Sequence, residues 1–166
     1  MTRGRRGSLA LHGTTLSFTT PRRFRPAHKA QAIDISPDGR EVWTGHGGDG
    51  GVSIIDVATK KVKQTLNLPH QGYNHLLFTP DGRRVLLSDS RGGELVVLDA
   101  AARKEIKGIK LGRSVTKFLI EPDGSRAYVA VNADSNVAVV DLKTLELTAR
   151  ISTGMDPDGM AWVGTR

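Results

Sequence analysis

The chain has 166 residues, 38% of them apolar, and a formal net charge of +7 at neutral pH. This length and composition describe a globular protein with a core and exclude fibrous classes. No apolar run approaches the roughly 18 residues of a membrane-spanning helix, so no membrane span is expected, and the lack of cysteine excludes disulfides and thiolate metal sites.

The excess positive charge lies at the start of the chain. Residues 1–29 hold seven of the 24 basic residues and no acidic one, which leaves 17 basic and 17 acidic residues in 30–166. Phe18 and Phe24 are the only aromatic residues there that could stack on bases, so nucleic acid is not expected as a partner. The segment also lacks the apolar stretch of roughly 7 to 15 residues that marks a secretory signal. We interpret residues 1–29 as a basic leader, disordered or non-native, and the compartment stays unknown.

A repeat begins after this segment. The tripeptide Pro-Asp-Gly occurs three times, with its prolines 43 and then 42 residues apart. It comprises Pro37, Asp38 and Gly39, then Pro80, Asp81 and Gly82, then Pro122, Asp123 and Gly124. Proline presets φ and glycine accepts positive φ, so each tripeptide predicts a turn between two strands. Nineteen residues after each proline an apolar run ends in an aspartate, Asp56, Asp99 or Asp141, which we interpret as a structural turn residue.

Each repeat contains four short apolar segments and no helix of convincing length. The fourth segment carries the kind of charge that protects an exposed sheet edge, Lys63, Lys107 or Arg150. Four short strands in roughly 43 residues are the pattern of a β-propeller blade. We therefore predict an all-β fold, a partial β-propeller of three four-stranded antiparallel blades plus one extra C-terminal strand. The blades span about 30–70, 73–113 and 115–155 within a repeat region of 30–166, and the extra strand spans 159–164.

The third repeat contains YVAVN at 128–132, SNVAVVD at 135–141 and GMDPDGMA at 154–161. It resembles the YVTN family of β-propeller repeats, whose consensus runs from Tyr-Val-Thr-Asn through Ser-Asn-Thr-Val-Ser-Val-Ile-Asp to Gly-x-x-Pro-x-Gly-x-Ala. The resemblance covers roughly residues 30–163, although the first two repeats depart from the Tyr-Val-Thr-Asn strand. It implies a ring of about seven blades, mostly in bacterial periplasmic or exported proteins, with ligands on the loop face. A WD-repeat propeller is the nearest alternative, but none of the three apolar runs ends in Trp-Asp.

Three blades do not close a ring, because propellers use roughly four to eight. Two explanations stay open. The chain is a C-terminal fragment whose missing blades lie upstream, or a second copy joins it to form a six-bladed ring. The expected partners are therefore missing blades or a second copy, together with a protein or small-molecule ligand that the sequence does not identify.

The candidate ligand residues lie on one predicted loop face. Loops between second and third strands and connections between blades emerge together, which gathers His46, His70, His75 and Asp89. The Gly-rich run 45–50 fits the spacing of a dinucleotide fingerprint, but a strand follows it where that fingerprint needs a helix, so we interpret it as a hairpin loop. We assign no metal, no cofactor and no catalytic residue.

A propeller fold does not fix a function. The absence of a recognisable catalytic motif favours a scaffold or a ligand- or protein-binding module of YVTN type. The family resemblance implies an alternative, a component of a quinone- or haem-linked oxidoreductase or a lactonase-like hydrolase or lyase that uses the loop face. Whether the chain catalyses a reaction stays open at this point.

Overall fold

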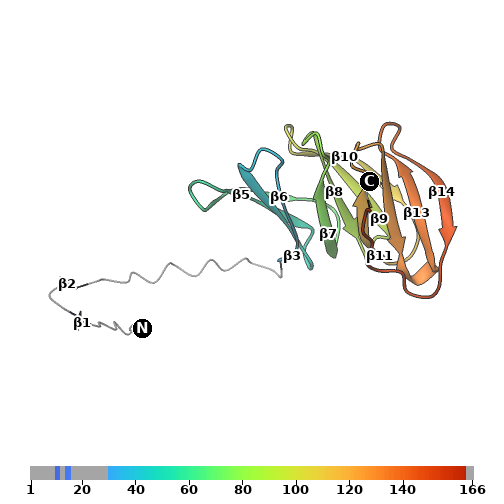
Figure 1. Ribbon diagram of the computed structural model, residues 1–166, viewed down its shortest axis with the longest axis horizontal. Helices are drawn as coiled ribbons and strands as arrows, with labels where there is room; N and C mark the ends of the chain where they lie inside the picture. The colour runs from blue at the N-terminus through green and yellow to red at the C-terminus, as the bar shows by residue number, and fades with distance from the viewer. Residues whose placement is uncertain (1–9, 12–13, 16–29, 164–166) are drawn as a thin grey trace.

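The computed structural model describes residues 10–11, 14–15 and 30–163 of the chain. Three four-stranded antiparallel sheets lie side by side in chain order (Figure 1). Most of the basic segment 1–29 lies outside the described residues. Within it, β1 (Ala10–Leu11) and β2 (Thr14–Thr15) pair as a short antiparallel ribbon.

Each sheet is one repeat, and its four strands pair in chain order. The first blade comprises β3 (Ala30–Ile35), β4 (Glu41–His46), β5 (Gly51–Asp56) and β6 (Lys61–Asn67). The second comprises β7 (Tyr73–Phe78), β8 (Arg84–Asp89), β9 (Glu94–Asp99) and β10 (Lys104–Lys110). The third comprises β11 (Val115–Ile120), β12 (Arg126–Val131), β13 (Asn136–Asp141) and β14 (Glu146–Ser152). The predicted all-β fold, a partial β-propeller, is thereby confirmed.

One helical turn, η1 (Asn132–Asp134), joins β12 to β13. The described part of the chain contains no helix long and apolar enough to cross a membrane.

The expected strand at 159–164 differs from the structure. Residues 153–163 form no strand, and residue 164 lies outside the described residues. A strand exists through its hydrogen-bonded ladder, and no described strand pairs with this segment. The third repeat therefore ends, for the described residues, at β14.

The core lies between the blades, in two clusters. One cluster joins the first and second blades around Trp43 and Leu87, and the other joins the second and third around Leu86 and Val129. Because side chains alternate across a strand, neighbouring residues such as Leu86 and Leu87 on β8 serve opposite clusters. The second blade thus contributes to both cores.

The first strands of the blades, β3, β7 and β11, are joined by hydrogen bonds that link one blade to the next. The backbone N–H of Phe78 donates to Asp34 Oδ2 at 2.9 Å, and that of Phe118 donates to His75 Nδ1 at 3.2 Å. These two polar side chains tie successive blades together along their inner edge.

Candidate ligand-binding site between the first two blades

The Pro-Asp-Gly turns all lie at one end of the blades, which we call the turn face. In the first turn Asp38 Oδ1 accepts from the Ser36 hydroxyl at 2.6 Å and from the Arg40 N–H at 3.0 Å. Gly39 has φ of 71°, in the left-handed region that favours glycine. The same bonds recur around Asp81, which accepts from Thr79 Oγ1 at 2.6 Å and from the Arg83 N–H at 3.0 Å. Hydrogen bonds to its own aspartate thus fix the conformation of each of these turns at the turn face.

The aspartates that close the third strands organise the other turn at this face. Asp56 Oδ1 accepts from both the backbone and the hydroxyl of Thr59 at 2.7 Å, and Asp141 Oδ1 accepts from the Thr144 N–H at 2.8 Å. Three residues of these turns share a left-handed backbone, with φ of 55° to 58°: Lys60, Arg103 and Leu145. The side chain of Arg103 points back toward the first blade.

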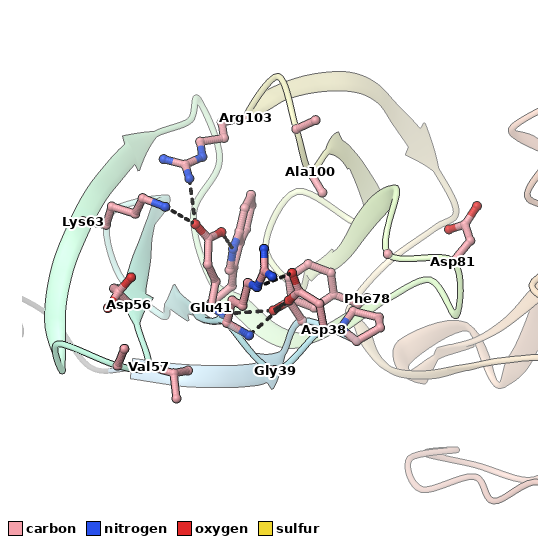
Figure 2. A pocket seen from close by; sticks show the side chains of 17 residues that line it. Asp38, Gly39, Glu41, Asp56, Val57, Lys63, Phe78, Asp81, Ala100 and Arg103 are labelled. Atoms are coloured by element: carbon pink, nitrogen blue, oxygen red, sulfur yellow. Dashed lines mark hydrogen bonds and ion pairs between the residues drawn. The ribbon is translucent and has the colours of Figure 1, made fainter.

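A cavity of about 820 Å³ opens on the turn face between the first and second blades (Figure 2). Its wall combines both kinds of turn from both blades. The lining includes charged side chains, Asp38, Arg40, Glu41, Asp56, Lys63, Asp81 and Arg103, and apolar ones, Trp43, Val57, Phe78, Ala100 and Ala101. A volume in the range of roughly 300 to 1,000 Å³ with a mixed lining is typical of a ligand pocket.

Glu41 stands at the centre of the polar wall (Figure 2). Its Oε1 lies 2.8 Å from Lys63 Nζ and 2.8 Å from an Arg103 guanidinium nitrogen, and its Oε2 accepts from Trp43 Nε1–H at 3.0 Å. Arg103 also donates to Gln64 Oε1 at 2.6 Å. Arg103 belongs to the second blade and Glu41 to the first, so their ion pair joins the two blades at the cavity wall.

The environment keeps Glu41 charged. Burial alone would raise the pKa of its carboxyl, but the hydrogen bonds from Lys63 and Trp43 and the charge of Arg103 outweigh burial and hold that pKa below its ordinary value. One carboxylate thus faces two cations. The ammonium of Lys63, whose side chain is 49% exposed, stays open to solvent and to an anionic group.

Trp43 and Phe78 lie behind the apolar wall as core residues, 1% and 9% exposed, and Val57, 38% exposed, is the more accessible apolar residue of the lining. The Trp43 and Phe78 rings meet edge to face, with centroids 5.6 Å apart and planes at 76°. Val57 and Ala100, from the turns that follow β5 and β9, line the cavity on its sides. The site can therefore take an apolar group beside a charged one.

The equivalent place between the second and third blades is different. The cavity there is about 250 Å³, and the Glu41 position is taken by Arg84, which donates to the carbonyl oxygen of Leu142. Of these two cavities, only the first has one carboxylate, Glu41, that pairs with two cations at 2.8 Å. The larger cavity therefore depends on residues particular to the first repeat and not on the repeat itself.

The sequence-predicted ligand residues lie at the opposite end of the blades, and the structure brings only two of the four together. His70 Nδ1 lies 3.3 Å from Asp89 Oδ2, and two further carboxylates face the ring: Glu94 at 3.8 Å and Glu105 at 3.0 Å. The Tyr73 ring packs nearby, with its hydroxyl buried and without a hydrogen-bond partner. Burial, followed by the charges of Asp89 and Glu105, raises the pKa of that hydroxyl.

The other two histidines lie apart from this cluster. His46 is 4% exposed and interacts with Asp49 Oδ1 at 3.1 Å and Ser53 Oγ at 2.9 Å. His75 packs edge to face on Phe118, and burial, followed by the charge of Lys117, lowers its pKa. Among the described residues no group of three histidine, cysteine, aspartate or glutamate side chains is placed to hold a metal ion.

Sequence reasoning did not single out Glu41, Trp43 or Arg103. A signal existed, because position 41 is acidic whereas Arg84 and Arg126 occupy it in the next two repeats. The reach of Arg103 depends on a left-handed backbone at a residue that is not glycine, and no sequence pattern indicates it.

Comparisons with known proteins identify the architecture. No protein-family profile matches the chain, and no curated protein matches it. Among solved structures the chain is similar to hydrazine synthase of Kuenenia stuttgartiensis, with a TM-score of 0.73 and 25% identity over 81% of this chain and 40% of that one. It is also similar to the RRP9 WD40 repeats, with a TM-score of 0.71 and 12% identity over 78% of this chain and 40% of that one. The chain spans about 40% of the length of each of these structures.

Proposed function

We propose that the chain is a β-propeller binding module of YVTN type and that the cavity between its first two blades takes a peptide segment of a protein partner. The observation that carries this proposal is the cavity wall itself. It sets apolar side chains beside Lys63 and Arg103, which both pair with Glu41 at 2.8 Å within a lining that also carries Asp38, Asp56 and Asp81.

The arrangement favours a segment with an acidic side chain next to an apolar one. The ammonium of Lys63 offers three N–H donors, gives one of them to Glu41 and is half exposed. A carboxylate from the ligand would accept from one of the remaining Lys63 donors, and the neighbouring apolar side chain would lie against Val57, which is 38% exposed. The third repeat's resemblance to the YVTN consensus and the propeller neighbours support the scaffold role.

The test is a peptide selection on the wild-type chain followed by calorimetric titration of the selected peptides. Lys63→Glu reverses the charge at the cavity and should weaken binding at least tenfold. Lys107→Glu makes the same charge change on β10, outside the cavity lining, and should leave binding unchanged. Selected peptides that lack acidic residues, or equal affinities for the two variants, would reject the proposal.

A further inference from the structure

The first blade leaves one of its faces uncovered toward its turn end. Ile33 and Ile35 on β3 are 68% and 49% exposed. The repeat places Leu76 and Phe78 at the equivalent positions of the second blade, where they are 0% and 9% exposed because the first blade packs on them. The same repeat positions are thus core in one blade and surface in another.

The third blade leaves part of the complementary face uncovered, although Val139 on the same face is 7% exposed. In the first blade Trp43 and Leu66 pack against the second blade and are 1% and 8% exposed. Their equivalents in the third blade are Tyr128, which is half-buried, and Ile151, which is 49% exposed. In the second blade the residue equivalent to Ile151 is Ile109, which the third blade covers to 6% exposure.

By repeat position, these two faces correspond to the two halves of an interface that the chain makes twice within itself, with Thr44 and Ser53 in the places of Leu87 and Val96. They lie at opposite ends of the stack of blades, the first blade at one end and β14 at the other (Figure 1). We propose that two copies of this chain associate head to tail, so that the third blade of each copy covers the first blade of the other. Such a contact is heterologous, and two of them close a ring of six blades, a number within the usual range of roughly four to eight.

A polar contact inside the chain indicates the register of this pairing. Arg84 of the second blade donates to the carbonyl oxygen of Leu142 in the third. The equivalent pair across the proposed contact is Arg126 of one copy and Val57 of the other. The side chain of Arg126 is 55% exposed and Val57 is 38% exposed, so both are accessible to a second copy.

On the exposed face of the first blade, the part near the turn face is the part that is suited to this contact. Ile33, Ile35 and Val57 are the exposed apolar residues there. Toward the other end, His46 and Ser53 already hydrogen-bond to each other at 2.9 Å and are buried. Docking therefore buries apolar surface without separating that polar pair from its partner.

Residues 153–163 follow the third blade and have to move when the second copy docks. This segment forms no strand, and Met155 and Trp162 are 89% and 52% exposed. Two hydrogen bonds join it to the third repeat: the Thr153 N–H donates to the carbonyl oxygen of Ser135 at 3.0 Å, and Asn132 Nδ2 donates to the carbonyl oxygen of Pro157 at 3.4 Å.

Sedimentation velocity of the full chain at micromolar concentration tests the pairing. We expect a particle of twice the 17.9 kDa chain mass that does not grow further at higher concentration. Ile33→Asp and Ile151→Asp, on the two different faces, should each give a monomer with an unchanged far-ultraviolet circular dichroism spectrum. Ile106→Asp, at an equally exposed residue of β10 on neither face, should leave the dimer intact.

Several outcomes would overturn the proposal. A wild-type monomer shows that something other than a second copy covers these faces. A dimer broken by Ile33→Asp but not by Ile151→Asp shows pairing of like faces, and mass that rises continuously with concentration shows an open chain. The cavity lies within one copy, so the outcome is independent of the peptide titration with Lys63→Glu.

Discussion

Replacing Glu41 tests how strongly the turn face holds the first blade to the second. Glu41→Gln keeps an acceptor for the Trp43 indole N–H but removes the charge that faces Lys63 and Arg103. Glu41→Leu removes both the acceptor and the charge. The difference between the two variants therefore separates the hydrogen bond from the ion pairs.

The magnitudes follow from burial. Trp43 is 1% exposed, so its indole N–H left without a partner costs about 1 to 3 kcal/mol. Exposed ion pairs are worth about 0.2 to 1 kcal/mol, and the Glu41 and Arg103 side chains, 18% and 23% exposed, lie at the upper end of that range. We expect Glu41→Gln to lower the free energy of unfolding by about 1 kcal/mol and Glu41→Leu by about 2 to 4 kcal/mol.

Urea unfolding followed by far-ultraviolet circular dichroism measures both values. A double-mutant cycle with Arg103→Gln isolates the contact between the blades, and we expect a coupling of about 1 kcal/mol. A coupling indistinguishable from zero, or a Gln variant as unstable as the Leu variant, would refute the reasoning.

Three further predictions concern the turns and the polar cluster. Hydrogen bonds within the turns lower the pKa of five exposed or nearly exposed aspartates, Asp38, Asp56, Asp81, Asp123 and Asp141. An aspartate whose pKa is lowered in the folded state stabilises the fold above the unfolded pKa of about 3.9, and this contribution is lost as the pH falls through the folded pKa. The melting temperature should therefore fall below about pH 4, and a constant melting temperature there would contradict this assignment. His70→Ala removes the imidazole that lies 3.3 Å from the 2% exposed carboxylate of Asp89, which keeps its hydrogen bonds from the Arg91 and Gly92 N–H groups. We expect it to destabilise the chain by about 1 to 3 kcal/mol in urea unfolding, whereas a loss well below about 1 kcal/mol would show that solvent replaces the imidazole. Gly93→Ala should destabilise the chain far more than Gly82→Ala, which costs about 1 kcal/mol. Both glycines have a positive φ, 69° and 68°, but only at Gly93 would the new Cβ meet the carbonyl oxygen of Gly112. Equal losses of stability in the two variants would count against the clash.

The fold could be predicted from the sequence because its landmarks are local. Pro-Asp-Gly and the aspartate that closes the third strand each specify a turn through their own backbone chemistry, so the strands between them followed. The strand at 159–164 could not be predicted in the same way. A strand also needs a neighbour, and apolar residues such as Trp162 and Val163 do not supply one.

The candidate site was harder to predict because it depends on side chains that reach between repeats. His70 and Asp89, two of the four residues predicted to share a face, lie 3.3 Å apart, while whether they bind a ligand stays a prediction. Glu41 and His46 begin and end the same strand, β4, so the large cavity lies at the opposite end of the blades from those histidines. Every repeated residue at this end of the blades already had a structural explanation as a turn residue. None of them therefore indicated a binding site there.

The position of the second blade between two separate cores has a consequence for how the protein unfolds. The first and third blades each bury one face against it, whereas Leu86 and Leu87 bury both of its faces. Opening an outer blade disrupts one cluster, but opening the middle blade disrupts both, so local opening should start at the ends. Amide hydrogens of β8 and β9 should then exchange with solvent last, and those of β3 and β14 first, so that protection decreases from the centre of the chain outward.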